Sequence, residues 1–88
     1  MNIKFESRFE KDLQIIKDKK LLSKIKKIII NCQESENITK IKNIKKLKGY
    51  DTFFSIKTGD YRFGVEILNN ELFFVRFLHR KDIYNLFP

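Results

Sequence analysis

The fold of this chain is decided by residues 54–79, FSIKTGDYRFGVEILNNELFFVRFLH, in which apolar and polar side chains alternate. Alternation with a period of two is typical of strands that bury one face. The pattern is interrupted at Gly59-Asp60 and at Asn69-Asn70, and both pairs suit the two-residue turns that connect antiparallel strands. The segment therefore predicts a meander of three antiparallel strands.

Two-residue turns also predict which residues face each other across the sheet. Lys57 should face Arg62 in the first hairpin, and Arg62 should face Phe77 in the second. One side of the sheet then becomes almost wholly apolar and able to pack on helices, with Phe54, Ile56, Phe63, Val65, Ile67, Leu72, Phe74 and Leu78. Arg76 falls on this side too, and nothing in the sequence accounts for it.

The other side of the predicted sheet combines cations, small residues and aromatics in a small area. Its members are Ser55, Lys57, Arg62, Gly64, Glu66, Phe73, Val75, Phe77 and His79. Two cations that face each other in a hairpin are locally unfavourable by roughly a few tenths of a kcal/mol. An anion would relieve this repulsion, and Gly64 would leave open space where a backbone or a phosphate could approach closely. The alternative is that both cationic side chains extend into water.

A short strand and a helix are expected before the meander. Polar and apolar residues alternate over residues 2–6, as in an opening strand. Ser7 followed by Glu10 forms a capping-box pattern, in which each side chain satisfies a free backbone N–H at a helix start. A helix should therefore begin at Ser7.

Two amphipathic helices forming a hairpin are predicted, separated by a basic break at residues 17–20. Apolar residues recur at helical spacing on either side of the break, at Phe9, Leu13 and Ile16 and then at Leu22, Ile25, Ile29 and Cys32. Lys20, Lys24 and Lys27 line the opposite face of the second helix, where solvation is the usual meaning of such a row and an anionic partner the less common one. Residues 35–49 are polar and lysine-rich, which predicts an irregular connection or helical turn.

Composition and charge restrict the class of protein. A chain of 88 residues with 42% hydrophobic residues and one proline is expected to form one folded domain. The net charge of +8 is typical of polyanion binders, although a lysine-rich surface needs no partner. The single cysteine, Cys32, allows no internal disulfide and fits a reducing compartment. No apolar run approaches the ~18 residues of a membrane helix, so a cytoplasmic protein without membrane contact is expected.

The groups needed for RNA cleavage without a metal ion are present near the predicted strand ends. Such cleavage needs a base near the ribose 2′-hydroxyl, cations at the phosphate and an acid at the leaving oxygen. The run HRKDIY, residues 79–84, adds a histidine, two cations and a tyrosine beside Arg62. Taken singly, His79 is more often structural and Tyr84 more often a half-buried anchor. One histidine, one cysteine and scattered carboxylates form no recognisable ligand set, so no metal and no other cofactor is predicted.

Three segments of the chain resemble those of RelE/ParE-superfamily toxins: residues 46–49 (KLKG), 59–62 (GDYR) and 79–84 (HRKDIY). The resemblance implies an α+β fold over residues 1–88, with an opening strand, a helix hairpin and a three-stranded antiparallel meander, related to small microbial ribonucleases. It implies the toxin of a type II toxin–antitoxin system that cleaves mRNA in the ribosomal A site and blocks translation. The ParE branch, which poisons DNA gyrase without cutting RNA, and a non-enzymatic RNA-binding domain are the alternatives.

The same resemblance implies site residues and partners. The catalytic roles would fall on Lys57, Arg62, His79, Arg80 and Tyr84. Ser55 stands where better-known members carry a second lysine, so that either Lys57 or His79 is the candidate base. Contacts to RNA phosphates are expected from Lys45, Lys46, Lys48 and Lys81. The expected partners are mRNA, the ribosome and a cognate acidic antitoxin that covers the helix hairpin and the basic side of the sheet.

Overall fold

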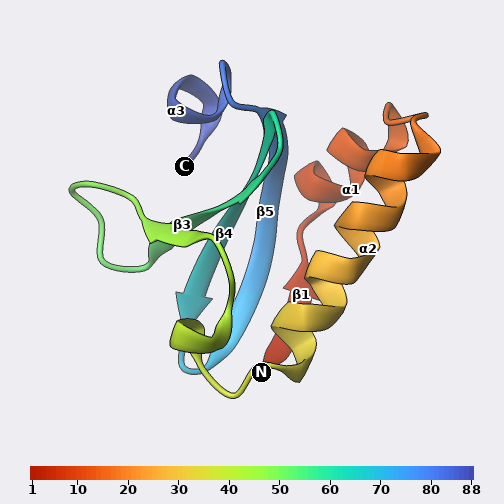
Figure 1. Cartoon of the computed structure of the whole chain (residues 1–88). Coiled ribbons are helices and arrows are strands. Elements are labelled where there is room, and N and C mark those ends of the chain that lie inside the picture. The colour runs from red at the N-terminus through yellow and green to blue at the C-terminus, as the bar shows by residue number, and fades with distance from the viewer.

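In the computed structural model, which describes all 88 residues, two helices pack on one face of a five-stranded sheet (Figure 1). The elements are β1 (Asn2–Phe5), α1 (Ser7–Gln14), α2 (Lys19–Glu34), the 3₁₀ turn η1 (Ile38–Lys40), β2 (Ile44–Lys46), β3 (Phe53–Thr58), β4 (Tyr61–Leu68), β5 (Glu71–His79) and α3 (Ile83–Leu86). The strand order is β1-β5-β4-β3-β2, and only β1 lies parallel to its neighbour. The predicted α+β class, helix hairpin and meander are confirmed. No helix is long and apolar enough to cross a membrane.

The two helix starts differ from the predicted capping. Helix α1 does begin at Ser7, but Glu6 occupies the N-cap position and no side chain caps the helix, so the capping-box prediction is wrong. Helix α2 begins inside the basic break. The Asp18 carboxylate accepts hydrogen bonds from the backbone N–H groups of Lys20 and Leu21, at 2.9 and 3.3 Å, and so satisfies two free donors of the first turn.

The main core lies between the helix hairpin and the sheet. Its buried members are Phe9, Ile25, Cys32, Ile41, Ile56, Phe63, Val65, Leu72, Phe74 and Phe77. The Phe9 ring of α1 lies 5.2 Å from the ring of Phe74 and 6.1 Å from that of Phe63, centroid to centroid. Burial raises the pKa of the Cys32 thiol to about 11. Cys32, which the helical spacing groups with the apolar residues of the second helix, is 0% exposed in this core.

A β-bulge in β5 changes the predicted arrangement of the second hairpin. The first hairpin has the predicted register, with Lys57 opposite Arg62. In the second, Val65 pairs with Phe74 but Gly64 pairs with Arg76, which leaves Val75 as an extra residue. An extra residue sends every later side chain of the strand to the other side of the sheet.

Three predictions about the end of β5 are corrected by this bulge. Arg62 faces Leu78 and not Phe77, so Leu78 lies on the side away from the helices. Phe77 is buried in the main core, where its ring stacks on that of Tyr61. His79 pairs with Tyr61 and therefore lies on the helix-covered side rather than beside Arg62.

The bulge also explains Arg76, which the unbroken register had placed in the core. Its Nε and Nη2 atoms donate to the two carboxylate oxygens of Asp12 in α1, at 2.8 and 3.1 Å. The Asp12 carboxylate also accepts the backbone N–H of Phe77, at 2.9 Å. Hydrogen bonding to Asp12 raises the pKa of the Arg76 guanidinium. Asp12 thus fastens α1 to the part of β5 that β1 does not reach.

The connection over residues 35–49 contains a strand that the sequence analysis did not predict. The helical turn expected there is η1, but β2 follows it and pairs with β3, with Lys45 opposite Ser55 and Lys46 opposite Phe54. The polypeptide then turns back through Gly49, whose φ of 87° is favourable for glycine. Strand β2 therefore forms a lysine-rich edge of the sheet.

Candidate nucleic-acid interface

The side of the sheet away from α1 and α2 is partly covered by the C-terminal segment (Figure 1). A small second core forms there from Leu47, Ile83 and Phe87, with Phe53, Val75 and Leu78 packed against it. The Phe87 ring lies so close to Gly64 that a Cβ atom at this position would be 2.7 Å from it. The space that Gly64 was predicted to leave for a phosphate is therefore filled by Phe87, and that prediction is wrong.

A cavity of about 200 Å³ lies between β2 and the C-terminal turn, and we call it the lysine pocket. Its lining residues are Lys45, Lys46, Leu47, Lys48, Ser55 and Tyr84. The structure thus brings three of the four lysines predicted to bind phosphate together with the predicted tyrosine. Tyr84 is 73% exposed, so its ring is free to stack on a base.

The charges of the lysine pocket are hardly neutralised by the protein itself. Lys45 and Lys48 form no ion pair, and Lys46 lies 3.6 Å from the carboxylate of Asp51, a side chain that is 99% exposed. An ion pair with so exposed a partner contributes little. Three cations around one small cavity therefore favour the binding of an anion.

The predicted cation pair of β3 and β4 continues the basic surface along the same side of the sheet. Lys57 lies two residues after Ser55 on β3 and faces Arg62 on β4. Neither Lys57 nor Arg62 forms an ion pair. The Arg62 Nη1 atom donates to the carbonyl oxygens of Gly59 and Tyr61, at 2.9 and 2.8 Å. These bonds hold the guanidinium at the β3–β4 turn, while its other N–H groups remain available as donors.

The remaining predicted residues lie around the end of β5. Arg80 has its Nε atom 3.9 Å from the Asp60 carboxylate, and its backbone N–H donates to the Asp60 carbonyl, which brings it to the same turn as Arg62. Lys81 is exposed, and its backbone N–H donates to Nδ1 of His79. The structure therefore groups Arg80 with Arg62, but it separates His79 from the pair formed by Lys57 and Arg62.

The element that carries the pocket, β2, was not predicted from the sequence. Strand β2 places Lys45 opposite Ser55, and the backbone N–H of Leu47 donates to the carbonyl of Phe53 to close the β2–β3 hairpin. A glycine-containing loop before an alternating segment is a hairpin signal. Gly49 ahead of Phe53 is such a signal, and it could have identified this hairpin.

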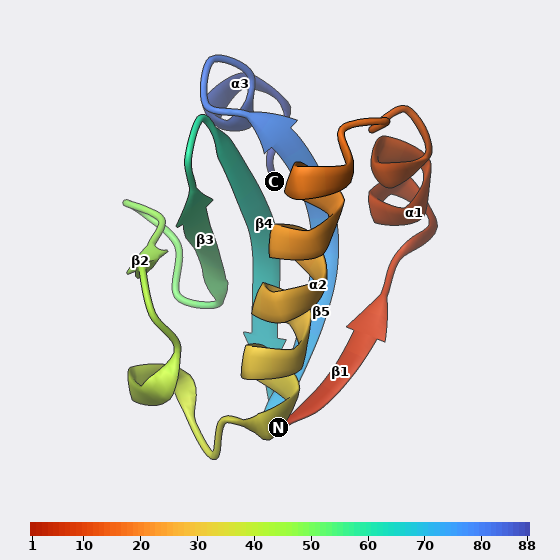
Figure 2. The same ribbon diagram turned by 45° about the vertical axis from the view of Figure 1, so that its right-hand side comes forward.

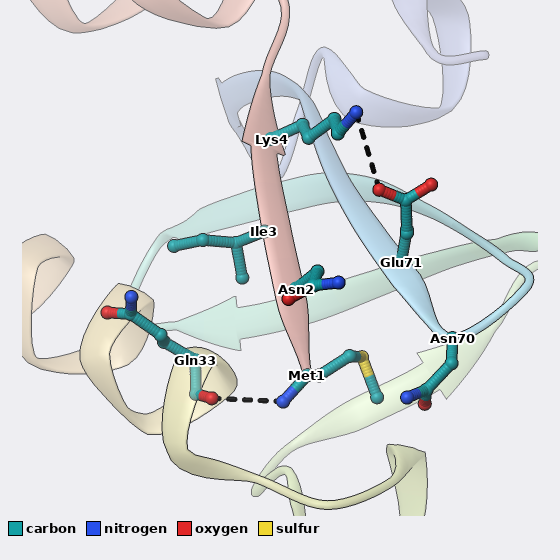
Figure 3. Close-up of a pocket in the computed structure, with 7 residues that line it drawn as sticks. All are labelled: Met1, Asn2, Ile3, Lys4, Gln33, Asn70 and Glu71. Atoms are coloured by element: carbon teal, nitrogen blue, oxygen red, sulfur yellow. Dashed lines mark hydrogen bonds and ion pairs between the residues drawn. The ribbon is translucent and has the colours of Figure 1, made fainter.

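The largest cavity, of about 670 Å³, lies at the other end of the sheet (Figure 3). It is lined by Met1, Asn2, Ile3, Lys4, Gln33, Asn70 and Glu71. Lys4 Nζ lies 3.4 Å from the Glu71 carboxylate, and the amino group of Met1 donates to the Gln33 carbonyl at 3.0 Å. Its cations are thus already paired within the protein. No group of three or more His, Cys, Asp or Glu side chains is arranged to hold a metal ion anywhere in the chain.

Comparisons with known proteins agree with the fold. The family model described as "ParE toxin of type II toxin-antitoxin system, parDE" matches residues 3–84. The chain is 40% identical to Toxin RelE3 of Methanocaldococcus jannaschii, over the full length of both.

Two solved structures have the same fold. A chain of the RelB–RelE antitoxin–toxin complex from Methanococcus jannaschii matches at 40% identity and a TM-score of 0.79, with 97% of this chain and 99% of that chain covered. A chain of the RelBE2 toxin–antitoxin complex from Mycobacterium tuberculosis matches at 20% identity and a TM-score of 0.72, with coverages of 90% and 96%. The second likeness concerns the fold alone.

Proposed function

The chain belongs to the RelE/ParE superfamily of toxins from type II toxin–antitoxin systems, and from that premise we propose that it is an endoribonuclease that cleaves mRNA in the ribosomal A site. The observation that carries this proposal is the group of cations on one side of the sheet, where Lys45 lies opposite Ser55 at the lysine pocket and Lys57 lies opposite Arg62. A pocket of three lysines, of which only Lys46 has an ion-pair partner, lies beside an exposed tyrosine. It suits a single RNA strand, whose phosphates need cations and whose bases need a stacking surface.

The proposed reaction is a transfer of the phosphate within one RNA strand. The 2′-oxygen attacks phosphorus and loses its proton to a base, the bond to the 5′-oxygen breaks, and an acid gives that oxygen a proton. Arg62 would stabilise the negative charge of the transition state. Lys57 is favoured as the base over His79, because only Lys57 lies on the side of Arg62. Arg80 at the same turn would add a second cation, and Lys81 would supply the acid.

The proposed partners include an acidic antitoxin that covers the helix hairpin and the basic side of the sheet. The relatives from Methanococcus jannaschii and Mycobacterium tuberculosis were each solved in toxin–antitoxin complexes. A net charge of +8 on 88 residues favours fast, steered association with an anionic protein. Masking of the lysine pocket would then keep the toxin inactive.

Primer extension on a reporter message tests the proposed cleavage. Shortly after induction of the protein, we expect cuts in the coding region with a codon periodicity, and we expect them to vanish when the product of the adjacent small reading frame is co-expressed. A matched reporter without a start codon should stay intact, because the proposed cleavage needs the ribosome. Cuts of equal intensity in the untranslated reporter would contradict the ribosomal part of the proposal.

A second candidate function is favoured by the description of the matching family model, which names ParE toxins. A ParE-like protein would inhibit DNA gyrase and leave RNA uncut. Intact reporter RNA together with relaxed plasmid DNA after induction would favour this alternative over the nuclease.

A further inference from the structure

A second group of lysines lies on the helix side of the molecule, where α2 runs along the sheet beside β3 and β4 (Figure 2). Two cavities follow this flank of α2. One, of about 270 Å³, is lined by Lys27, Lys42 and Lys57 together with Ile28, Asn31 and Asn43. The other, of about 320 Å³, includes Lys20 and Lys24 beside the β3–β4 turn. We call Lys20, Lys24, Lys27, Lys42 and Lys57 the helix-flank lysines.

The helix-flank lysines are not neutralised by the protein. None of the five forms an ion pair, and no carboxylate lines the cavity of Lys27, Lys42 and Lys57. The cavity beside the turn does contain carboxylates, those of Asp18 and Asp60. Asp18 caps α2, and Asp60 lies 3.9 Å from Arg80 Nε.

The position of these lysines on α2 differs from that of an ordinary solvated row. Lys20, Lys24 and Lys27 share one helix face and line the cavities against the sheet. Lys19 and Lys26, seven residues apart, share a different face and line neither cavity. The helix thus carries one pair of lysines on an open surface and three lysines in a concave one, which offers a matched comparison within a single element.

When the acidic antitoxin proposed to cover the helix hairpin is absent, the chemistry of the flank suits phosphates better than another protein surface. Protein interfaces are depleted in lysine and are centred on apolar or aromatic side chains. Here Ile28 is the one apolar residue around the cavity of Lys27, Lys42 and Lys57. Lysine ammonium groups are point charges with three rotatable donors, which bind phosphate oxygens without a fixed geometry.

We propose that the helix-flank lysines bind the phosphate backbone of a structured RNA outside the cleavage site, and so hold the toxin on its RNA target. Lys57 joins the two surfaces, since it follows Ser55 of the lysine pocket on β3 and also lines the flank cavity. The inference rests on the proposed function for the class of ligand. It assigns binding to Lys20, Lys24, Lys27 and Lys42, whereas Lys57, where the two surfaces meet, keeps its proposed role as the base.

The salt dependence of RNA binding tests this proposal. The affinity of the purified protein for a fluorescein-labelled RNA hairpin is measured by anisotropy over a series of KCl concentrations. The flank variant Lys24→Gln/Lys27→Gln is compared with the control variant Lys19→Gln/Lys26→Gln, which removes the same charge from the same helix. Each lost phosphate contact lowers the slope of log affinity against log salt by ~0.7–0.9. We therefore expect the slope of the flank variant to fall by about 1.5 and that of the control to stay near the original value.

Equal slopes for the two variants would overturn the proposal. A flank variant that loses more affinity for polyglutamate than for the hairpin would overturn it too, in favour of an acidic protein partner. Thermal melting of both variants verifies that they fold. Because the readout is binding, its result is separate from the reporter experiment. If the reporter is cleaved but the flank variant keeps the original salt slope, only the proposed RNA contact of the flank is rejected. If the slope falls but the reporter stays intact, only the proposed nuclease activity is rejected.

Discussion

The two sides of the sheet are covered in different ways. On one side, α1 and α2 bury ten residues in a continuous core. On the other, a four-residue helix and the residues after it bury three. The second side also carries the lysine pocket and Tyr84. Segments with few buried apolar contacts open at a lower free energy than the core, so the proposed chemistry lies on the more loosely held side of a firm scaffold.

Removing a side chain from the helix-side core is expected to have the largest effect. Phe9 is 0% exposed and packs against Phe63 and Phe74, so Phe9→Ala should lower the free energy of unfolding by about 3–5 kcal/mol. That is a large part of the roughly 5–15 kcal/mol typical of a domain. Urea denaturation measures the loss. Phe5→Ala, at a ring that is 45% exposed, is the control and should cost clearly less; equal losses would contradict the comparison.

The next largest effect is expected at Arg62, where a substitution should abolish activity without loss of stability. Arg62→Ala removes the proposed stabiliser of phosphate charge, and loss of one such group lowers a rate by roughly 10²- to 10³-fold. We expect a folded protein that no longer arrests growth. Arg8→Ala, at an exposed arginine without an ion pair, is the matched control and should remain toxic. Growth arrest by a well-expressed Arg62→Ala protein would remove this residue from the mechanism.

The sequence predicts those parts of the sheet that are fixed by residues close together in the chain, and it fails where residues distant in the chain decide the structure. The β3–β4 register was correct because the adjacent Gly59-Asp60 turn fixes it locally. The bulge at Val75 was not predictable in this way. The hydrogen bond beside it joins the N–H of Phe77 to Asp12 of α1, which lies 65 residues earlier in the sequence. The covering of Gly64 was not predictable for the same reason, because the residue that covers it, Phe87, is also distant in sequence.

The residue types of the site were easier to predict than their arrangement. Lys45, Lys46, Lys48 and Tyr84 were named from the sequence, and the structure gathers them at one cavity. His79 was named as well, but its side of the sheet depends on a single extra residue in β5. Whether these residues act in catalysis stays a prediction that the Arg62 experiment begins to test.

The pH dependence of stability tests the helix-side core through its buried thiol, Cys32. Burial raises the pKa of the Cys32 thiol from 9.0 to about 11, so the folded state keeps a proton that the unfolded chain loses. The resulting stabilisation is complete below pH 9.0 and is lost as the pH rises toward 11. The difference corresponds to roughly 2–3 kcal/mol. We expect the stability gap between the unmodified protein and Cys32→Ala to narrow over this range, and parallel curves would contradict the assignment.

The smallest effect is expected at the C-terminal cover. Phe87 packs edge to face on Phe53 at 5.5 Å between ring centroids and lies over Gly64. Phe87→Leu keeps an apolar side chain but loses the aromatic pair, which should cost about 1 kcal/mol. Because this contact holds the C-terminal segment on a sheet that has its own backbone hydrogen bonds, the loss should appear as local opening of that segment. Hydrogen exchange should become about fivefold faster at residues 83–87, while the amides of β4 exchange at their original rate. If β4 loses protection to the same extent, the two cores unfold together, and the C-terminal segment is then part of the scaffold rather than a loosely held cover of the site.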